Sequence, residues 1–289
     1  MEHGSLPQVL QGLPRLHTLH LPGTSLRGQH ELDALLAATQ LTSIQLNFIY
    51  DLTRSRADAP CSWQRLELTA SDYLDCIPAT IAAYLPLHSL THPLRFDSLE
   101  FNSWDSTALV TAAVHNLTQA CKVKVKVKLL TLNMSNSWGM SGDLGMRELL
   151  ALLQPLCKCW RNAGSTFTLD GATIRAKDVE ALAPLCQGCT HLQLSKGSLA
   201  PTVRFWRQVV QLLPTVSQVT FFDVKDVYVH SSITAMCQSL RGMAEQPWAR
   251  WLDIKVIDKS QSQSAGWQAN YEFQHPSQPQ RFRVSFVQF

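Results

Sequence analysis

Several cysteines in this sequence have a spacing that could hold a metal ion or perform redox chemistry. "CQGC" places Cys186 and Cys189 three positions apart, the spacing of zinc knuckles and of redox motifs, and "CKC" adds Cys157 and Cys159. A structural zinc site needs four ligands, however, and no second C-x-x-C occurs. Because Cys189 also occupies an apolar position of a predicted strand, we expect these thiols to pack in the core. A Cys-dependent metal or redox protein is therefore the least favoured of three hypotheses.

The motifs of common catalytic and nucleotide-binding sites do not occur in the sequence. It contains no G-x-S-x-G, G-x-x-x-x-G-K-[ST], H-E-x-x-H or G-x-G-x-x-G segment. The glycine-dotted "NSWGMSGDLGM" lacks the lysine of a phosphate-binding loop and is typical of a long turn before a helix. We therefore predict a chain that is not an enzyme and uses no cofactor.

The run "KVKVKVK" could form a strand with one basic face. Lys122, Lys124, Lys126 and Lys128 would then lie side by side and could bind a nucleic acid or another acidic surface. The whole chain carries a net charge of only +3, which does not favour nucleic acid as a partner. In the other interpretation, the valines face the core and the lysines stay in water, where they prevent a β-prone edge from pairing with another chain. The basic strand is our second hypothesis.

The alternation of apolar and polar residues changes where this run ends. The valines occupy odd positions up to Val127, but Leu130 and Leu132 follow at +3 and +5, on even positions. A strand of constant phase would leave both leucines in water. The same spacing recurs along the chain, once with glycine in the first place. The nine segments are "LHTLHL" (16–21), "LTSIQL" (41–46), "WQRLEL" (63–68), "FDSLEF" (96–101), "VKLLTL" (127–132), "GSTFTL" (164–169), "CTHLQL" (189–194), "VSQVTF" (216–221) and "WLDIKV" (251–256).

Most of the text between these segments predicts helices, with apolar residues at i, i+3 and i+4. The predicted helical ranges are 29–38, 104–120, 143–156, 176–188, 205–214 and 231–246. After Asp258 a Ser-, Gln- and Pro-rich connection follows, and "RFRVSFVQF" alternates as a terminal strand. Together with "ANYEFQ" this strand could pair with the last repeat and cover its edge.

This alternation of "LxxLxL" strands and "AxxLxxLxxL"-type helices resembles the leucine-rich repeat, in particular its ribonuclease-inhibitor subtype. The resemblance is clearest over 166–199 and covers most of 6–257. It implies an α/β solenoid of about nine irregular repeats, with a curved parallel β-sheet on the concave side, helices on the convex side and a C-terminal β-hairpin-like cap. We expect the solenoid to span 1–258, truncated at its N-terminal end, and the connection and capping strand to span 259–289.

The sequence departs from the family pattern at the third position after the last leucine, where Asn or Cys is usual. Thr24, Ile49 and Ala172 are among the residues found there instead. We therefore expect each turn to satisfy its own polar groups and the curvature to be irregular.

The resemblance implies a non-catalytic scaffold that binds a protein partner on the concave face. Because side chains alternate across a strand, the residues between the apolar ones point to that face. The candidate partner-binding residues are Arg65, Glu67, Glu100, Asn102, Asn133, Asp170, His191, Gln193, Phe222 and Lys255. Aromatic and arginine side chains among them are the expected anchors. The alternative is that this face is simply solvated sheet.

The chain shows no signal for a membrane or for secretion. It has no run of eighteen apolar residues, and its first residues lack the positive charge and apolar centre of a signal peptide. Its eight cysteines are scattered rather than concentrated in a small scaffold, which favours reduced thiols. We expect a cytoplasmic protein.

Overall fold

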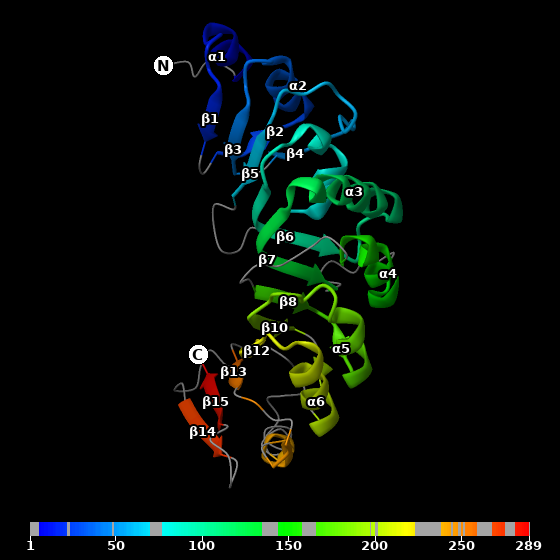
Figure 1. The fold of residues 1–289 in the computed structure, drawn as a ribbon, viewed down its shortest axis with the longest axis vertical. Coiled ribbons are helices and arrows are strands. Elements are labelled where there is room, and N and C mark those ends of the chain that lie inside the picture. The colour runs from blue at the N-terminus through cyan, green and yellow to red at the C-terminus, as the bar shows by residue number, and fades with distance from the viewer. Residues whose placement is uncertain are drawn as a thin grey trace. The chain divides into compact units, whose positions relative to one another are not determined.

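The computed structural model has an α/β fold with a mostly parallel sheet (Figure 1). It describes residues 6–21, 24–47, 49–69, 77–134, 144–157, 166–196, 198–199, 202–222, 238–243, 245–247, 250, 252–258, 268–274 and 281–288. The order of the hydrogen-bonded strands is β1-β3-β5-β6-β7-β8-β10-β12-β13-β15-β14.

The chain divides into two compact units. The first contains Met1–Phe101, Asp105–Leu129 and Leu152–Arg161, and the second contains Asn102–Trp104, Leu130–Ala151 and Asn162–Phe289. The boundary passes through β6 (Leu94–Asn102) and β7 (Val125–Asn133), so both strands contribute to both units.

The first unit contains short parallel strands with helices on one side of them (Figure 1). Besides β6 and the start of β7, its elements are α1 (Leu6–Gly12), β1 (Thr18–Leu21), β2 (Leu26–Arg27), α2 (Gln29–Ala37), β3 (Ser43–Leu46), β4 (Ile49–Tyr50), β5 (Arg65–Leu68), η1 (Ala79–Ala83), η2 (Leu87–Ser89), α3 (Thr107–Ala120) and η3 (Cys121–Val123). The hydroxyl of Ser106 accepts a hydrogen bond from Leu109 N at 3.3 Å and caps α3.

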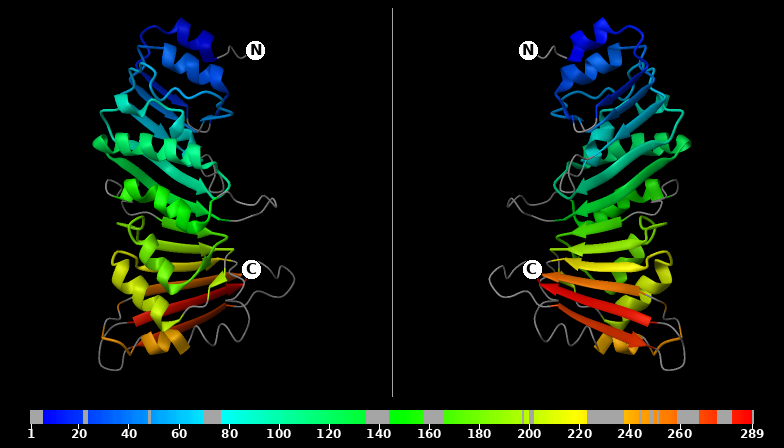
Figure 2. Two further views of the ribbon diagram at one scale, coloured as in Figure 1. Left: turned by 90° about the vertical axis from the view of Figure 1, so that its right-hand side faces the viewer. Right: turned by 90° about the vertical axis from the view of Figure 1, so that its left-hand side faces the viewer.

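The second unit has the same arrangement of strands and helices, and it ends in an antiparallel pair (Figure 2). Besides the end of β7, its elements are α4 (Met146–Cys157, shared with the first unit), β8 (Thr166–Asp170), β9 (Thr173–Ile174), α5 (Ala176–Leu182), β10 (His191–Ser195), β11 (Ser198–Leu199), α6 (Val203–Leu212), β12 (Gln218–Phe222), β13 (Leu252–Asp258), β14 (Gln268–Gln274) and β15 (Arg281–Gln288). Of the helix predicted over 231–246, residues 238–243 are helical, and 231–237 lie outside the described residues. Strand β15 pairs in parallel with β13, and β14 pairs antiparallel with β15.

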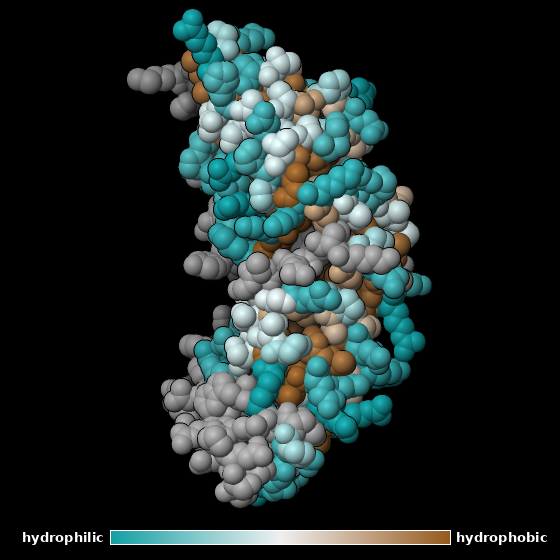
Figure 3. Space-filling view, in the orientation of Figure 1, coloured by the Kyte–Doolittle hydropathy of each residue, from teal (hydrophilic) through white to brown (hydrophobic). Residues whose placement is uncertain are grey.

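The core lies between the strands and helices of each unit. The described apolar positions of the repeating segments are buried, except Leu16 and Leu21, which are half-buried. The parallel register places these positions opposite one another, as for Leu192 and Val219. Trp206 on α6 is fully buried, and its ring packs edge-to-face with Phe205 and Phe221 at centroid distances of 5.2 and 6.0 Å. Within each unit, hydrophobic residues form a seam flanked by hydrophilic ones (Figure 3).

The predicted change of phase is confirmed in β7 and occurs in β6 as well. β7 buries Val127 and then Leu130, while β6 buries Phe96 and then Leu99. The prediction that the strand starts at Lys122 is wrong. Residues Cys121–Val123 form a 3-10 helix and Lys124 has a φ of 72°, so the strand begins only at Val125.

Backbone hydrogen bonds join neighbouring turns. Asn47 N donates to Thr24 O at 3.2 Å, and Gly171 N donates to Ser195 O at 2.8 Å. Our expectation that each turn satisfies only its own polar groups is therefore wrong. The turn positions Ile49 and Ala172 are 2% and 7% exposed, so apolar side chains are buried at these two turns.

Candidate functional site

In the second unit, the parallel register arranges polar side chains in rows across the strands. One row contains Thr166, His191, Gln218 and Asp253. The next row contains Thr168, Gln193, Thr220 and Lys255, and a third contains Asp170, Ser195, Phe222 and Ile257. The tertiary structure thus brings together five of the predicted partner-binding residues, which are Asp170, His191, Gln193, Phe222 and Lys255.

His191 stands between two threonine hydroxyls of the neighbouring strands. Its Nε2 lies 2.8 Å from Thr220 Oγ1, and its Nδ1 lies 3.4 Å from Thr166 Oγ1. Burial lowers the pKa of His191, the positive charge of Lys255 lowers it further, and Asp253 acts in the opposite direction. The imidazole is therefore held neutral, as a hydrogen-bonding group of the sheet face.

Asp170 and Asn102 do not present the accessible groups that a partner surface requires. Asp170 is 9% exposed, and one of its oxygens pairs with Lys196 Nζ at 3.3 Å. Its other oxygen is buried and has no hydrogen-bond partner among the described residues. Asn102 is 5% exposed, while Asn133 and Phe222 are half-buried.

In the first unit, Arg65 and Glu67 lie two residues apart on β5 and form an ion pair at 3.3 Å. The Arg65 side chain is 48% exposed and that of Glu67 is 18% exposed. Glu67 lies opposite Gln45 on one side and Arg95 on the other. Glu100 is half-buried, and its backbone N donates to Ile77 O at 2.8 Å.

The four lysines of the run are exposed, while Val125 and Val127 are each 3% exposed. This confirms for Val125 and Val127 that the valines pack on the core while the lysines stay in water, whereas Val123 is half-buried in η3. Lys122 lies in η3 rather than in the strand, and Lys128 pairs with Asp97 at 2.5 Å. The four lysines therefore do not form one uniform basic row.

Cys186 and Cys189 are 1% and 0% exposed. The Cys189 thiol donates to the carbonyl of His191 at 2.9 Å, and burial raises its pKa to about 11. In the part of the chain that the structure describes, no three His, Cys, Asp or Glu side chains gather as a metal site. Cys159 lies outside the described residues.

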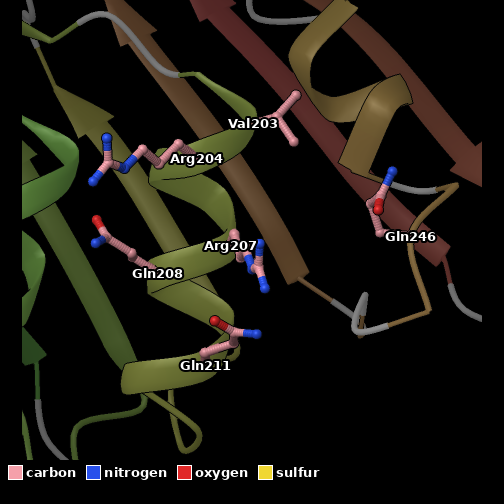
Figure 4. Close-up of a pocket in the computed structure, with 6 residues that line it drawn as sticks. All are labelled: Val203, Arg204, Arg207, Gln208, Gln211 and Gln246. Atoms are coloured by element: carbon pink, nitrogen blue, oxygen red, sulfur yellow. The ribbon is translucent and has the colours of Figure 1, made fainter.

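A pocket of about 540 Å³ along α6 was not predicted from the sequence. It is lined by Val203, Arg204, Arg207, Gln208, Gln211 and Gln246. Figure 4 shows Arg204 and Gln208 projecting from one side of α6, and Arg207, Gln211 and Val203 from the side that faces Gln246. Guanidinium and amide groups suit an anionic or peptide-like ligand. The pocket could have been predicted from the Arg and Gln residues of "VRFWRQVVQ", which alternate with the apolar residues of a helix and therefore face outward.

No protein-family model matches this chain, and no curated protein sequence is significantly similar to it. Among the described residues, no helix has the length and apolar character needed to cross a membrane.

Proposed function

We propose that this chain is a non-catalytic interaction scaffold, a leucine-rich-repeat solenoid that binds a protein partner through the polar face of its sheet. The observation that carries the proposal is the set of in-register rows on parallel strands. Polar side chains repeat across neighbouring strands on one face, while the alternate apolar positions are buried.

Such rows suit the recognition of a protein surface. Adjacent strands lie about 4.8 Å apart, so the rows offer closely spaced donors and acceptors on a backbone that the core holds rigid. Gln193 and Lys255 are half-buried, so their side chains retain some access to solvent. Phe222 and Arg65 belong to the residue types that contribute most to binding energy, and both lie on strands.

A hydrolytic function finds less support in the His191–Thr220 pair. The 2.8 Å contact has the geometry of a base and a nucleophile. Thr220 is only 5% exposed, however, so a substrate carbonyl could not reach its hydroxyl without a rearrangement of the sheet. A hydrogen bond that stabilises the sheet face is the simpler role.

Affinity purification with matched variants tests the proposal. Q193R/Q218R alters the sheet face of the second unit, and R65E/E67R inverts the charges of the first while keeping their attraction. K177E/E180K, on exposed positions of α5, is the control. We expect a partner retained by the wild type and the control to be lost from a sheet-face variant. If every partner stayed bound to both sheet-face variants, the proposal would be wrong.

A further inference from the structure

The register between β6 and β7 in the first unit determines which charges face each other. Leu94 N donates to Lys124 O at 3.1 Å, which places Leu94 opposite Val125 in a parallel pair. Arg95 then lies opposite Lys126, and Asp97 opposite Lys128. The ion pair between Asp97 and Lys128 at 2.5 Å agrees with this register.

Two described acidic residues of β5 and β6 are already engaged by a cation. Glu67 pairs with Arg65, and Asp97 pairs with Lys128. Arg95, Lys124 and Lys126 are exposed and form no ion pair with the described residues. We call these three residues the cationic triad.

Two features of the triad destabilise the chain in the absence of a ligand. Like charges directly opposite each other on adjacent strands repel, as Arg95 and Lys126 must. Lys124 also has φ 72° and ψ 134°, a conformation that favours glycine. Unfavourable local conformations cluster at binding sites, where a ligand or the surrounding structure compensates for them.

We propose that Arg95, Lys124 and Lys126 bind carboxylates of an acidic segment in the protein partner. This inference rests on the proposed function and specifies the chemistry of the partner. A carboxylate between Arg95 and Lys126 would replace their repulsion by two charge-assisted hydrogen bonds. A nucleic acid fits less well, because the cationic triad offers only three positive charges and the whole chain carries a net charge of only +3.

Fluorescence anisotropy with two labelled probes tests the proposal, one a glutamate decapeptide and the other a single-stranded oligonucleotide. We expect the wild type to bind the peptide more tightly than the oligonucleotide, with an affinity that falls as salt is added. R95E/K126E should weaken peptide binding about tenfold or more, which corresponds to at least about 1.4 kcal/mol. R147E/K177E makes the same change in net charge at exposed positions of α4 and α5 and should bind as the wild type does.

Neutral variants separate binding from folding. R95Q/K126Q removes the repulsion, and K124G places glycine where the backbone favours it. Both should bind the peptide more weakly while their melting temperatures stay equal to that of the wild type or rise.

Three results would overturn the proposal: undiminished peptide binding by R95E/K126E, an equal loss in R147E/K177E, or tighter binding of the oligonucleotide through Arg95 and Lys126. If the peptide fails to bind while the sheet-face variants still lose their partner, this inference is wrong and the proposed function stands.

Discussion

The imidazole Nε2 of His191 on β10 lies 2.8 Å from the hydroxyl oxygen of Thr220 on β12, one row further along the sheet. The contact joins two rows of polar side chains on the second unit. It explains how a half-buried histidine is accommodated on a sheet face next to Lys255, because a neutral imidazole can pair with hydroxyls on both sides.

The stability of the protein should fall as the solution is acidified below about pH 6.5, the ordinary pKa of histidine. The folded chain resists protonation of His191, so the unfolded chain binds that proton more readily and is favoured as the pH falls. Stability is lost progressively from the ordinary pKa down to the lowered one. Thermal unfolding of the wild type and H191Q at several pH values measures this, and H191Q should show the smaller dependence. H115Q, at an exposed histidine, should behave as the wild type does.

Removal of the hydroxyl of Ser239 should destabilise the second unit by about 1–3 kcal/mol, because it deprives a buried N–H of its acceptor. The indole Nε1 of Trp206 donates to Ser239 Oγ at 3.2 Å, and both side chains are buried. Urea unfolding of S239A, W206F and the double variant measures the coupling energy between the two side chains. Strictly additive effects in this cycle would show that the hydrogen bond contributes nothing.

The thiols of Cys186 and Cys189 should not react with iodoacetamide in the native protein at neutral pH. Both are buried, and a pKa of about 11 leaves almost no thiolate on Cys189. Peptide mass spectrometry after labelling checks this, with the half-buried Cys121 as the internal comparison. All eight cysteines should react in denaturant. Rapid native labelling of Cys189, or zinc bound by the purified protein, would revive the metal or redox hypothesis.

Replacing the cap of α6 should destabilise the protein by about 1 kcal/mol. Thr202 Oγ1 accepts a hydrogen bond from Phe205 N at 3.2 Å. T202A loses this acceptor, whereas T202S keeps it and is the matched control. Urea unfolding of the two variants should separate them, and equal midpoints would contradict the assigned cap.

Local features of the structure were predictable from the sequence. The i, i+3, i+5 spacing identified most of the buried strand side chains, including the shift from Val127 to Leu130, because alternation across a strand depends only on neighbouring residues. Leu16 and Leu21, in the first segment, are half-buried instead. The same pattern placed His191 and Gln193 on the opposite face. It could not show that Asp170 and Asn102 on that face are buried, since burial depends on what packs around them.

The alternation of strands and helices, and the division of each strand into a core side and a polar side, follow from the amino-acid sequence alone. Which charges face each other depends on the fold. Asp97 and Lys128 are separated by about thirty positions, and no local pattern specifies that they pair at 2.5 Å or that Arg95 lies opposite Lys126. Pairing between strands depends on the register of distant backbone groups. This register pairs Lys128 with Asp97, while Arg95, Lys124 and Lys126 form no ion pair with the described residues.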